Sequence, residues 1–170
     1  MMRRLTAATI ATVTVLVGCR PPTAPTELPD APFGAVAALI DGRSWVSTVR
    51  PDSVVAFYTA DRRFLQVTGL QVRGDFWPAL FLQLTFGPGS VAPGAGAVPD
   101  SVTGLWFDFG ERGLRGAFQT VGRSIDSLEL EELDHVAGRI RGAFLFTAPE
   151  IDGSRQVHVR GRFAGRLLSQ

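Results

Sequence analysis

The chain has 170 residues, of which 45% are hydrophobic and 19% charged, and this length and composition are typical of one globular domain with its own core. Its formal charge of +1 gives no electrostatic basis for binding nucleic acid. The single cysteine excludes a disulfide framework within the chain. Because there are also only two histidines, we expect no metal site, and we expect no cofactor. All basic residues are arginine and asparagine is absent, a bias that we interpret as the mark of a GC-rich bacterial genome.

The N-terminus has the pattern of an export signal. Arg3 and Arg4 give it a positively charged start, and Leu5 to Val17 contains only apolar residues and threonine. This run is shorter than the roughly 20 apolar residues of a permanent membrane-spanning helix. A secretory signal fits it better, so residues 1–18 are predicted to be a signal peptide.

The apolar run ends in Leu16-Val17-Gly18-Cys19, which resembles the lipobox of bacterial lipoproteins. The resemblance implies cleavage between Gly18 and Cys19, diacylglycerol on the Cys19 thiol, and a fatty acid such as palmitate on the new amino terminus. Two or three acyl chains anchor a protein stably. Arg20 follows the cysteine in place of aspartate, which by analogy with enteric bacteria favours the outer membrane over the inner. The alternative is a free thiol in an ordinary secreted protein.

Residues 19–33 are predicted to be a tether. Arg20 to Pro32 has five prolines in thirteen residues, and such a stretch prefers an extended polyproline conformation. At about 3.1 Å per residue it reaches on the order of 40 Å. We interpret it as a spacer between the lipid and a single β domain at 34–170.

From residue 34 onward apolar and polar residues alternate, which is typical of half-buried antiparallel strands. The prediction is an all-β fold, an antiparallel β-sandwich or flattened barrel of about 8–10 strands. Turn chemistry is present at Asp41-Gly42 and at Asp152-Gly153. The expected strands are 34–41, 44–49, 53–60, 63–72, 79–86, 103–109, 114–120, 124–131, 136–147 and 155–167.

The last three expected strands suggest a register. Matching Leu130 with Ile140, across a turn at 132–135, places acidic residues opposite arginines on the outer face. Matching Phe144 with Val159 across the next hairpin brings two arginines together beside these acids. The prediction is one solvated charge ladder made by Glu129, Glu131, Arg139, Arg141 and Arg162.

The segments 38–45, 138–146 and 157–163 resemble the opening turn and the closing hairpin of an uncharacterised class of bacterial surface lipoprotein domains. In that class a short strand, a D/N-G turn and a tryptophan begin the fold, and strands carrying G-x-F-x-F and G-x-F end it. The resemblance implies an all-β sandwich or barrel. It implies no activity and no functional residues.

The sequence offers little for catalysis, so we expect a protein that is not an enzyme. No serine lies in a G-x-S-x-G elbow, and a triad would have to recruit His135 or His158. The acidic run Asp126 to His135 is interpreted as a solvated strand face, with a calcium site as the less favoured alternative.

The candidate binding surface consists of Trp77, Trp106 and Phe81. Alternation places Trp106 opposite Leu105 and Phe107, so it is expected to face outward or into a barrel lumen. The Gly- and Pro-rich segment 87–100 is expected to be a long loop, which serves either as a connector or in function.

These observations predict an envelope-anchored lipoprotein whose non-catalytic β domain is a structural or interaction module. Its expected partners are the membrane, through the lipid, and an envelope protein, a polysaccharide or a small apolar ligand. The alternative is a lipocalin-like carrier of a small apolar ligand, suggested by apolar residues on both faces of 79–86.

Overall fold

The computed structural model describes residues 27–48, 54–59, 64–71, 79–85, 101–110, 113–121 and 125–169. Over these ranges the chain is all-β, as predicted, and contains no helix that could cross a membrane. The strands are β1 (Ala35–Ile40), β2 (Arg43–Val46), β3 (Val54–Thr59), β4 (Phe64–Leu70), β5 (Ala79–Thr85), β6 (Ser101–Gly110), β7 (Gly113–Gln119), β8 (Ile125–Asp134), β9 (Arg139–Pro149) and β10 (Gln156–Ser169).

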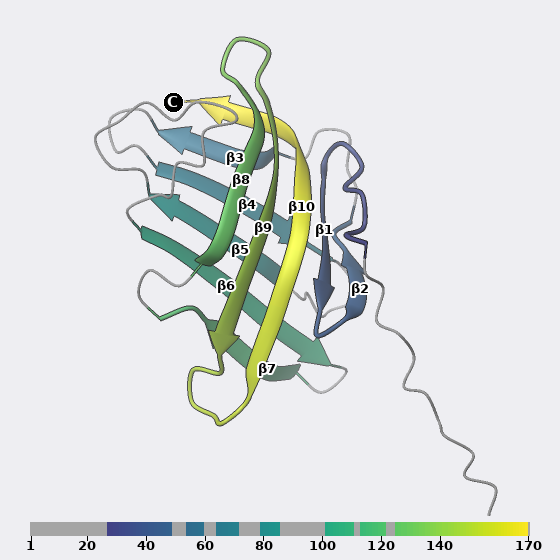
Figure 1. Ribbon diagram of the computed structural model, residues 1–170, viewed down its shortest axis with the longest axis vertical. Helices are drawn as coiled ribbons and strands as arrows, with labels where there is room; N and C mark the ends of the chain where they lie inside the picture. Colours follow the sequence, from purple (N-terminus) through teal and green to yellow (C-terminus); the bar gives the residue numbers. More distant parts are fainter. Residues whose placement is uncertain are drawn as a thin grey trace, which may run out of the picture.

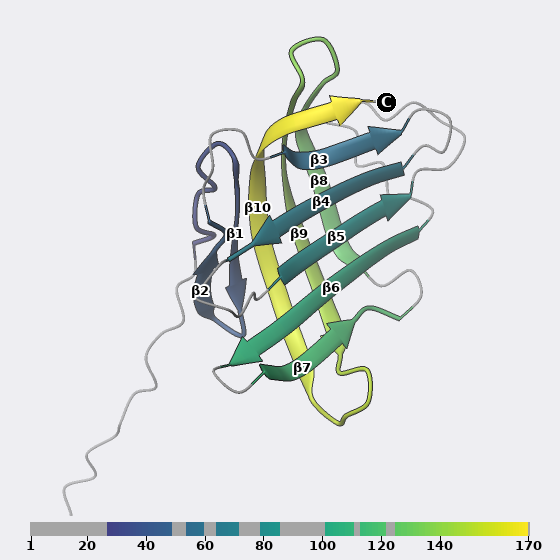
Figure 2. The ribbon, with the colours of Figure 1, turned by 180° about the vertical axis from the view of Figure 1, so that it is seen from behind.

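The strands form one mixed sheet that folds over into two crossed layers (Figure 1). We call the layer β8-β9-β10-β1-β2 the β9 layer and the layer β3-β4-β5-β6-β7 the β5 layer. Figure 2 shows the β5 layer from its outer side, with the long β9 and β10 crossing behind it. Because β2 and β7 end the pairing order, the sheet is not closed into a barrel. Of the two predicted architectures, the layers fit the sandwich better.

The longest strand, β10, joins the two layers. It pairs with β9 along one edge from Gln156 to Arg166. Its other edge pairs with β1 up to Ala164, and then with β3 in parallel from Arg166 to Ser169. Among the described pairs, this parallel one departs from the predicted antiparallel arrangement. The register shifts between Arg166 and Leu167, as the strand passes from one layer to the other.

The core lies between the layers and is built from the inward side chains of both. Phe146 and Phe163 of the β9 layer and Leu65, Leu80 and Leu82 of the β5 layer are fully buried. Burying a large apolar side chain contributes about 1.5–3 kcal/mol to the free energy of unfolding, so these residues account for much of the domain's stability.

Two glycines let the aromatic core rings lie across neighbouring strands. Gly161 of β10 is opposite Phe144 of β9, and Phe163 of β10 is opposite Gly142 of β9. The two rings stack with their centroids 6.3 Å apart. A Cβ on Gly161 would lie 2.5 Å from the carbonyl oxygen of Ala37, closer than two such atoms can approach.

The predicted β8–β9 register is wrong, although the face that each inward leucine occupies is correct. Leu130 pairs with Gly142, and Asp134 is the residue opposite Arg139. The turn occupies residues 135–138, because the carboxylate of Asp134 accepts hydrogen bonds from the backbone N–H groups of Val136 and Ala137, each at 2.8 Å. The shift in register and the β-bulge between Leu130 and Glu132 together leave the inward residues of β8 opposite the inward residues of β9.

The predicted β9–β10 register is wrong by two residues, a shift that also preserves the faces. Val159 pairs with Phe146, and Arg162 is opposite Ala143 instead of another arginine. Arg141 and Arg162 are therefore not opposite each other, and the two arginines that this ladder does pair are Arg139 and Arg166. Arg162 instead donates to the carboxylate of Asp30 at 3.1 Å.

Replacing Gly161→Ala should lower the free energy of unfolding by about 1–3 kcal/mol, because the added methyl group overpacks a site bounded by backbone. Urea denaturation followed by tryptophan fluorescence measures the change. Ser127→Ala, at an exposed position of β8, is the control and should stay within about 0.5 kcal/mol of the wild type. Equal stability of Gly161→Ala and wild type would contradict the close approach of β1 and β10.

Candidate functional site

The two layers present outer faces of different charge. Strands β3, β4 and β5 contain no charged residue, and β6 and β7 contain one each, whereas β8, β9 and β10 contain five, two and three. Glu129, Glu131, Arg139 and Arg141 are exposed, and Arg162 is half-buried, which agrees with the predicted solvated face. The outward side chains of β4 to β7 include one charged residue, the exposed Arg115 of the edge strand β7. We call the uncharged ones the neutral face: Gln66, Thr68, Leu70, Phe81, Gln83, Thr103, Leu105, Phe107, Ala117 and Gln119.

The strand register arranges most of the neutral face in rows that run across the strands. One row is polar and consists of Gln66, Gln83 and Thr103. The next row mixes amide, hydroxyl and apolar groups: Thr68, Phe81, Leu105 and Gln119. Beyond it, Phe107 is opposite Ala117 and its ring lies 6.4 Å from that of Phe109. The face thus changes from polar to apolar over three rows.

The sequence-predicted binding residues separate in the structure. Phe81 is part of the neutral face and is half-buried. The prediction that Trp106 faces outward or into a barrel lumen is wrong: it is buried in the core between the layers, and its ring meets that of Trp45 edge to face, with centroids 5.4 Å apart. Trp77 lies outside the described residues, as do the lipobox residues Gly18 and Cys19 and the segment 87–100. The structure therefore does not bring Trp106 together with Phe81 on a shared surface.

Sequence reasoning missed the neutral face as a whole. Its signal was present in the distribution of charge, because the predicted strands between 79 and 120 contain very few charged residues. Alternation within one strand identifies its outward residues, but it does not tell which outward residues of other strands lie beside them.

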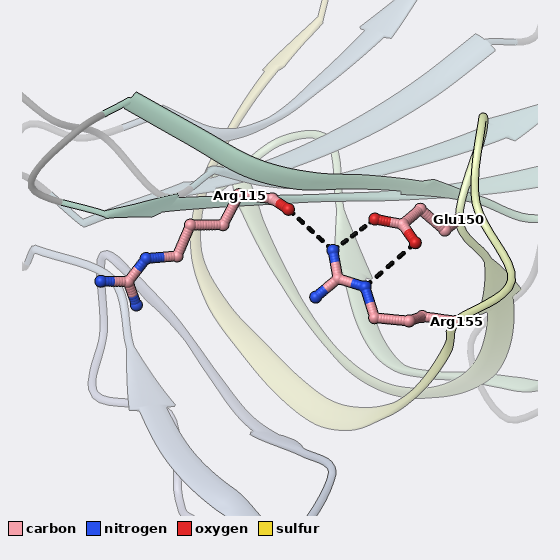
Figure 3. A network of polar contacts seen from close by, with 3 residues as sticks. All are labelled: Arg115, Glu150 and Arg155. Atoms are coloured by element: carbon pink, nitrogen blue, oxygen red, sulfur yellow. Dashed lines mark hydrogen bonds and ion pairs between the residues drawn. The ribbon is translucent and has the colours of Figure 1, made fainter.

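A polar corner links β7 to the hairpin between β9 and β10 (Figure 3). The guanidinium of Arg155 binds both carboxylate oxygens of Glu150, one of them through Nε at 3.0 Å. Its Nη2 also donates to the carbonyl oxygen of Arg115 at 2.7 Å, and its Cζ lies 5.4 Å from the centre of the Phe118 ring. Arg155 therefore fastens the two layers at the corner opposite the β10–β3 junction.

Three polar side chains form a chain across the outer face of the β9 layer. The hydroxyl of Thr147 lies 3.0 Å from Nδ1 of His158 and donates to a carboxylate oxygen of Asp126 at 3.3 Å. In a catalytic triad the carboxylate orients the imidazole, whereas here it contacts the hydroxyl. We interpret the group as a link between β8, β9 and β10.

The two histidines lie in different parts of the β9 layer. His135 belongs to the β8–β9 turn, and the centroid of its ring lies 4.8 Å from that of Tyr58. The backbone N–H of His158 donates to a carboxylate oxygen of Asp41 at 2.9 Å. Within the described part of the chain, no three His, Cys, Asp or Glu side chains are close enough to hold a metal ion.

Comparisons with known proteins found no match to this chain among family models, curated proteins or solved structures. The case for its function therefore depends on the residues and geometry described above.

The corner at Glu150 should give a pH-dependent contribution to stability. The hydrogen bond from Arg155 lowers the pKa of the Glu150 carboxyl, so this contribution is present above the unfolded-state pKa and is lost as the pH falls through the folded-state pKa. The melting temperature of Glu150→Gln should lie below that of the wild type near neutral pH, and the two should converge as the pH falls below the lowered folded-state pKa of Glu150. Glu131→Gln, at an exposed position of β8, controls for the loss of one carboxylate elsewhere. A gap that stays constant with pH would contradict the ion pair.

Proposed function

We propose that this protein is an envelope lipoprotein, anchored through Cys19, whose β domain binds an envelope component through the neutral face. The proposal assigns no catalytic role to the domain and favours the outer membrane over the inner. The observation that carries it is the contrast between the outer face of the β9 layer, which carries many charged residues, and that of the β5 layer, where Arg115 is the one exposed charged residue described on β4 to β7. Contiguous exposed apolar surface rimmed by polar groups is typical of interaction sites.

The point at which the N-terminal segment joins the domain supports the neutral face as the binding surface. The chain enters the domain at the β9 layer, where Gly34 donates to the carbonyl oxygen of Ala164 at 2.8 Å. Just before this point, Asp30 forms its ion pair with Arg162 on the outer face of the same layer. An anchor that joins the β9 layer leaves the neutral face on the opposite side of the domain, directed away from its own tether.

The packing between the layers favours a surface module over an internal carrier. Fully buried side chains from both layers, such as Phe146, Phe163 and Leu82, meet in one cluster. A carrier needs an apolar cavity of ligand size, commonly 300–1,000 Å³ or so. The carrier remains an outcome of the test below, where it would appear as a bound lipid in place of a surface contact.

The lipid anchor predicts that the wild type, expressed in a bacterium with lipoprotein-processing enzymes, takes up radioactive palmitate and fractionates with membranes. Cys19→Ala should lose both the label and the membrane association, because no other thiol is present. Cys19→Ala combined with Ser127→Cys restores one thiol at an exposed position of β8 and should stay unlabelled. Equal labelling or equal membrane association of wild type and Cys19→Ala would refute the anchor.

If the neutral face is the binding surface, contacts in cells should form on that side of the domain and not on the outer face of the β9 layer. A photocrosslinking amino acid at Gln83 should capture envelope material, whereas the same probe at Arg141, on the outer face of the β9 layer, should capture little. The measurement is the yield of crosslinked product per molecule of protein after illumination. Equal yields, or capture from position 141 alone, would exclude the neutral face as the contact surface. Lipid released from the purified protein, with no crosslink at either position, would favour the carrier.

A further inference from the structure

We propose that the partner of the neutral face is an uncharged polysaccharide laid across strands β4 to β7. This inference rests on the proposed function, because it names the class of molecule that the same face binds. It is carried by three features of the face: its side-chain chemistry, its rows in register, and its size.

The side-chain chemistry fits hydroxyl-rich, uncharged rings. Gln66, Gln83 and Thr103 each carry both a donor and an acceptor, so each can bond a sugar hydroxyl in either sense. The Nε2 group of Gln66 donates to the Thr68 hydroxyl at 3.4 Å, a long and weak bond that a ligand can replace. Beside these groups, the half-buried rings of Phe81 and Phe107 offer flat apolar surface for the C–H faces of sugar rings.

The absence of charge discriminates among polymers. A nucleic acid or an acidic polysaccharide is recognised through several arginines or lysines, whereas none of the ten side chains of the neutral face is basic and Arg115 of β7 is the one arginine exposed beside them among the described residues of β4 to β7. An acidic or basic protein surface would likewise find no complementary charge there. An uncharged polymer carries no charge that would need an ionic partner on such a face.

The rows suit a chain that runs across the strands. Neighbouring strands are spaced about 4.8 Å apart, close to the length of one sugar ring, so successive rings meet successive strands. Along this direction the polar row from Gln66 to Thr103 lies beside the mixed row that contains Phe81. One edge of the polymer can therefore hydrogen-bond while its ring faces lie on apolar groups.

The size of the face argues against a second copy of the chain as its occupant. Four strands about 4.8 Å apart, paired over about seven residues, span a flat area of roughly 450 Å². A stable protein–protein interface buries roughly 800 Å² on each partner. An extended oligosaccharide needs a smaller contact area, and the width of strands β4 to β7 is enough for it.

Affinity electrophoresis of the mature chain, residues 19–170 with Cys19→Ala, tests the inference. The gels contain one of several uncharged polysaccharides (a β-1,3-glucan, hydroxyethyl cellulose, a galactomannan or dextran) or the acidic polysaccharide alginate. We expect at least one uncharged gel to retard the protein, equally in low and high salt, because no charges take part. Phe81→Ala should weaken the retardation at least fivefold, and Gln83→Ala at least threefold.

Leu145→Ala, on the outer face of the β9 layer, is the matched control and should leave the retardation unchanged. Thermal melting of each variant separates lost binding from lost folding. No retardation in any uncharged gel, equal retardation of Phe81→Ala and wild type, or retardation by alginate alone would overturn the inference. Concentration-dependent dimerisation that Gln83→Arg abolishes would overturn it in favour of a second copy. If Gln83 crosslinks to a protein in cells while no glycan binds, the proposed function stands and this inference fails.

Discussion

The fold depends on the pairing of β10 with three other strands. Every buried backbone N–H and C=O group needs a partner, and a strand of fourteen residues can supply partners to β9, to β1 and, after its shift at Arg166, to β3. This single strand makes one sheet out of two layers. Small residues allow it: Gly161 lies under the ring of Phe144, and Gly165 leaves room for Val55 of β3. The Arg155 corner fastens the layers at the other end of the crossing.

Because one strand sets the crossing of the layers, it also sets which residues face outward. In the β9 layer many of these are acids and arginines, and in the β5 layer, apart from Arg115, they are amides, hydroxyls and apolar groups. The N-terminal segment joins the β9 layer through Gly34 and Asp30, on the charged side. The N-terminal segment, which we propose is lipid-linked, and the neutral face thus belong to opposite sides of one domain, and this arrangement is the physical basis of the proposed function.

Alternation alone predicted the strands well, because a residue pattern of period two reports burial on one face of each strand. The Asp-Gly pair itself predicted the turn at Asp41-Gly42, where both residues have the positive φ angles, 48° and 77°, that such a turn requires. Register was harder, because shifting β10 by two residues keeps every apolar side chain inward and alternation cannot detect the shift. The turn after Asp134 depends on side-chain hydrogen bonds that the pattern of apolar residues does not contain. The orientation of Trp106 required knowing that β6 faces β9, a contact between distant parts of the chain.

The central claim is that the neutral face is covered in the cell envelope and the charged face is not. Hydroxyl-radical footprinting measures this directly, by comparing side-chain oxidation of the protein in intact cells with that of the purified, unbound protein. The account predicts that Phe81 and Phe107 are protected in cells, while Leu145 and the fully exposed Val136, in the β9 layer, are oxidised equally in both samples. Equal oxidation of Phe81 and Phe107 in both samples, or protection at Leu145 instead, would contradict it.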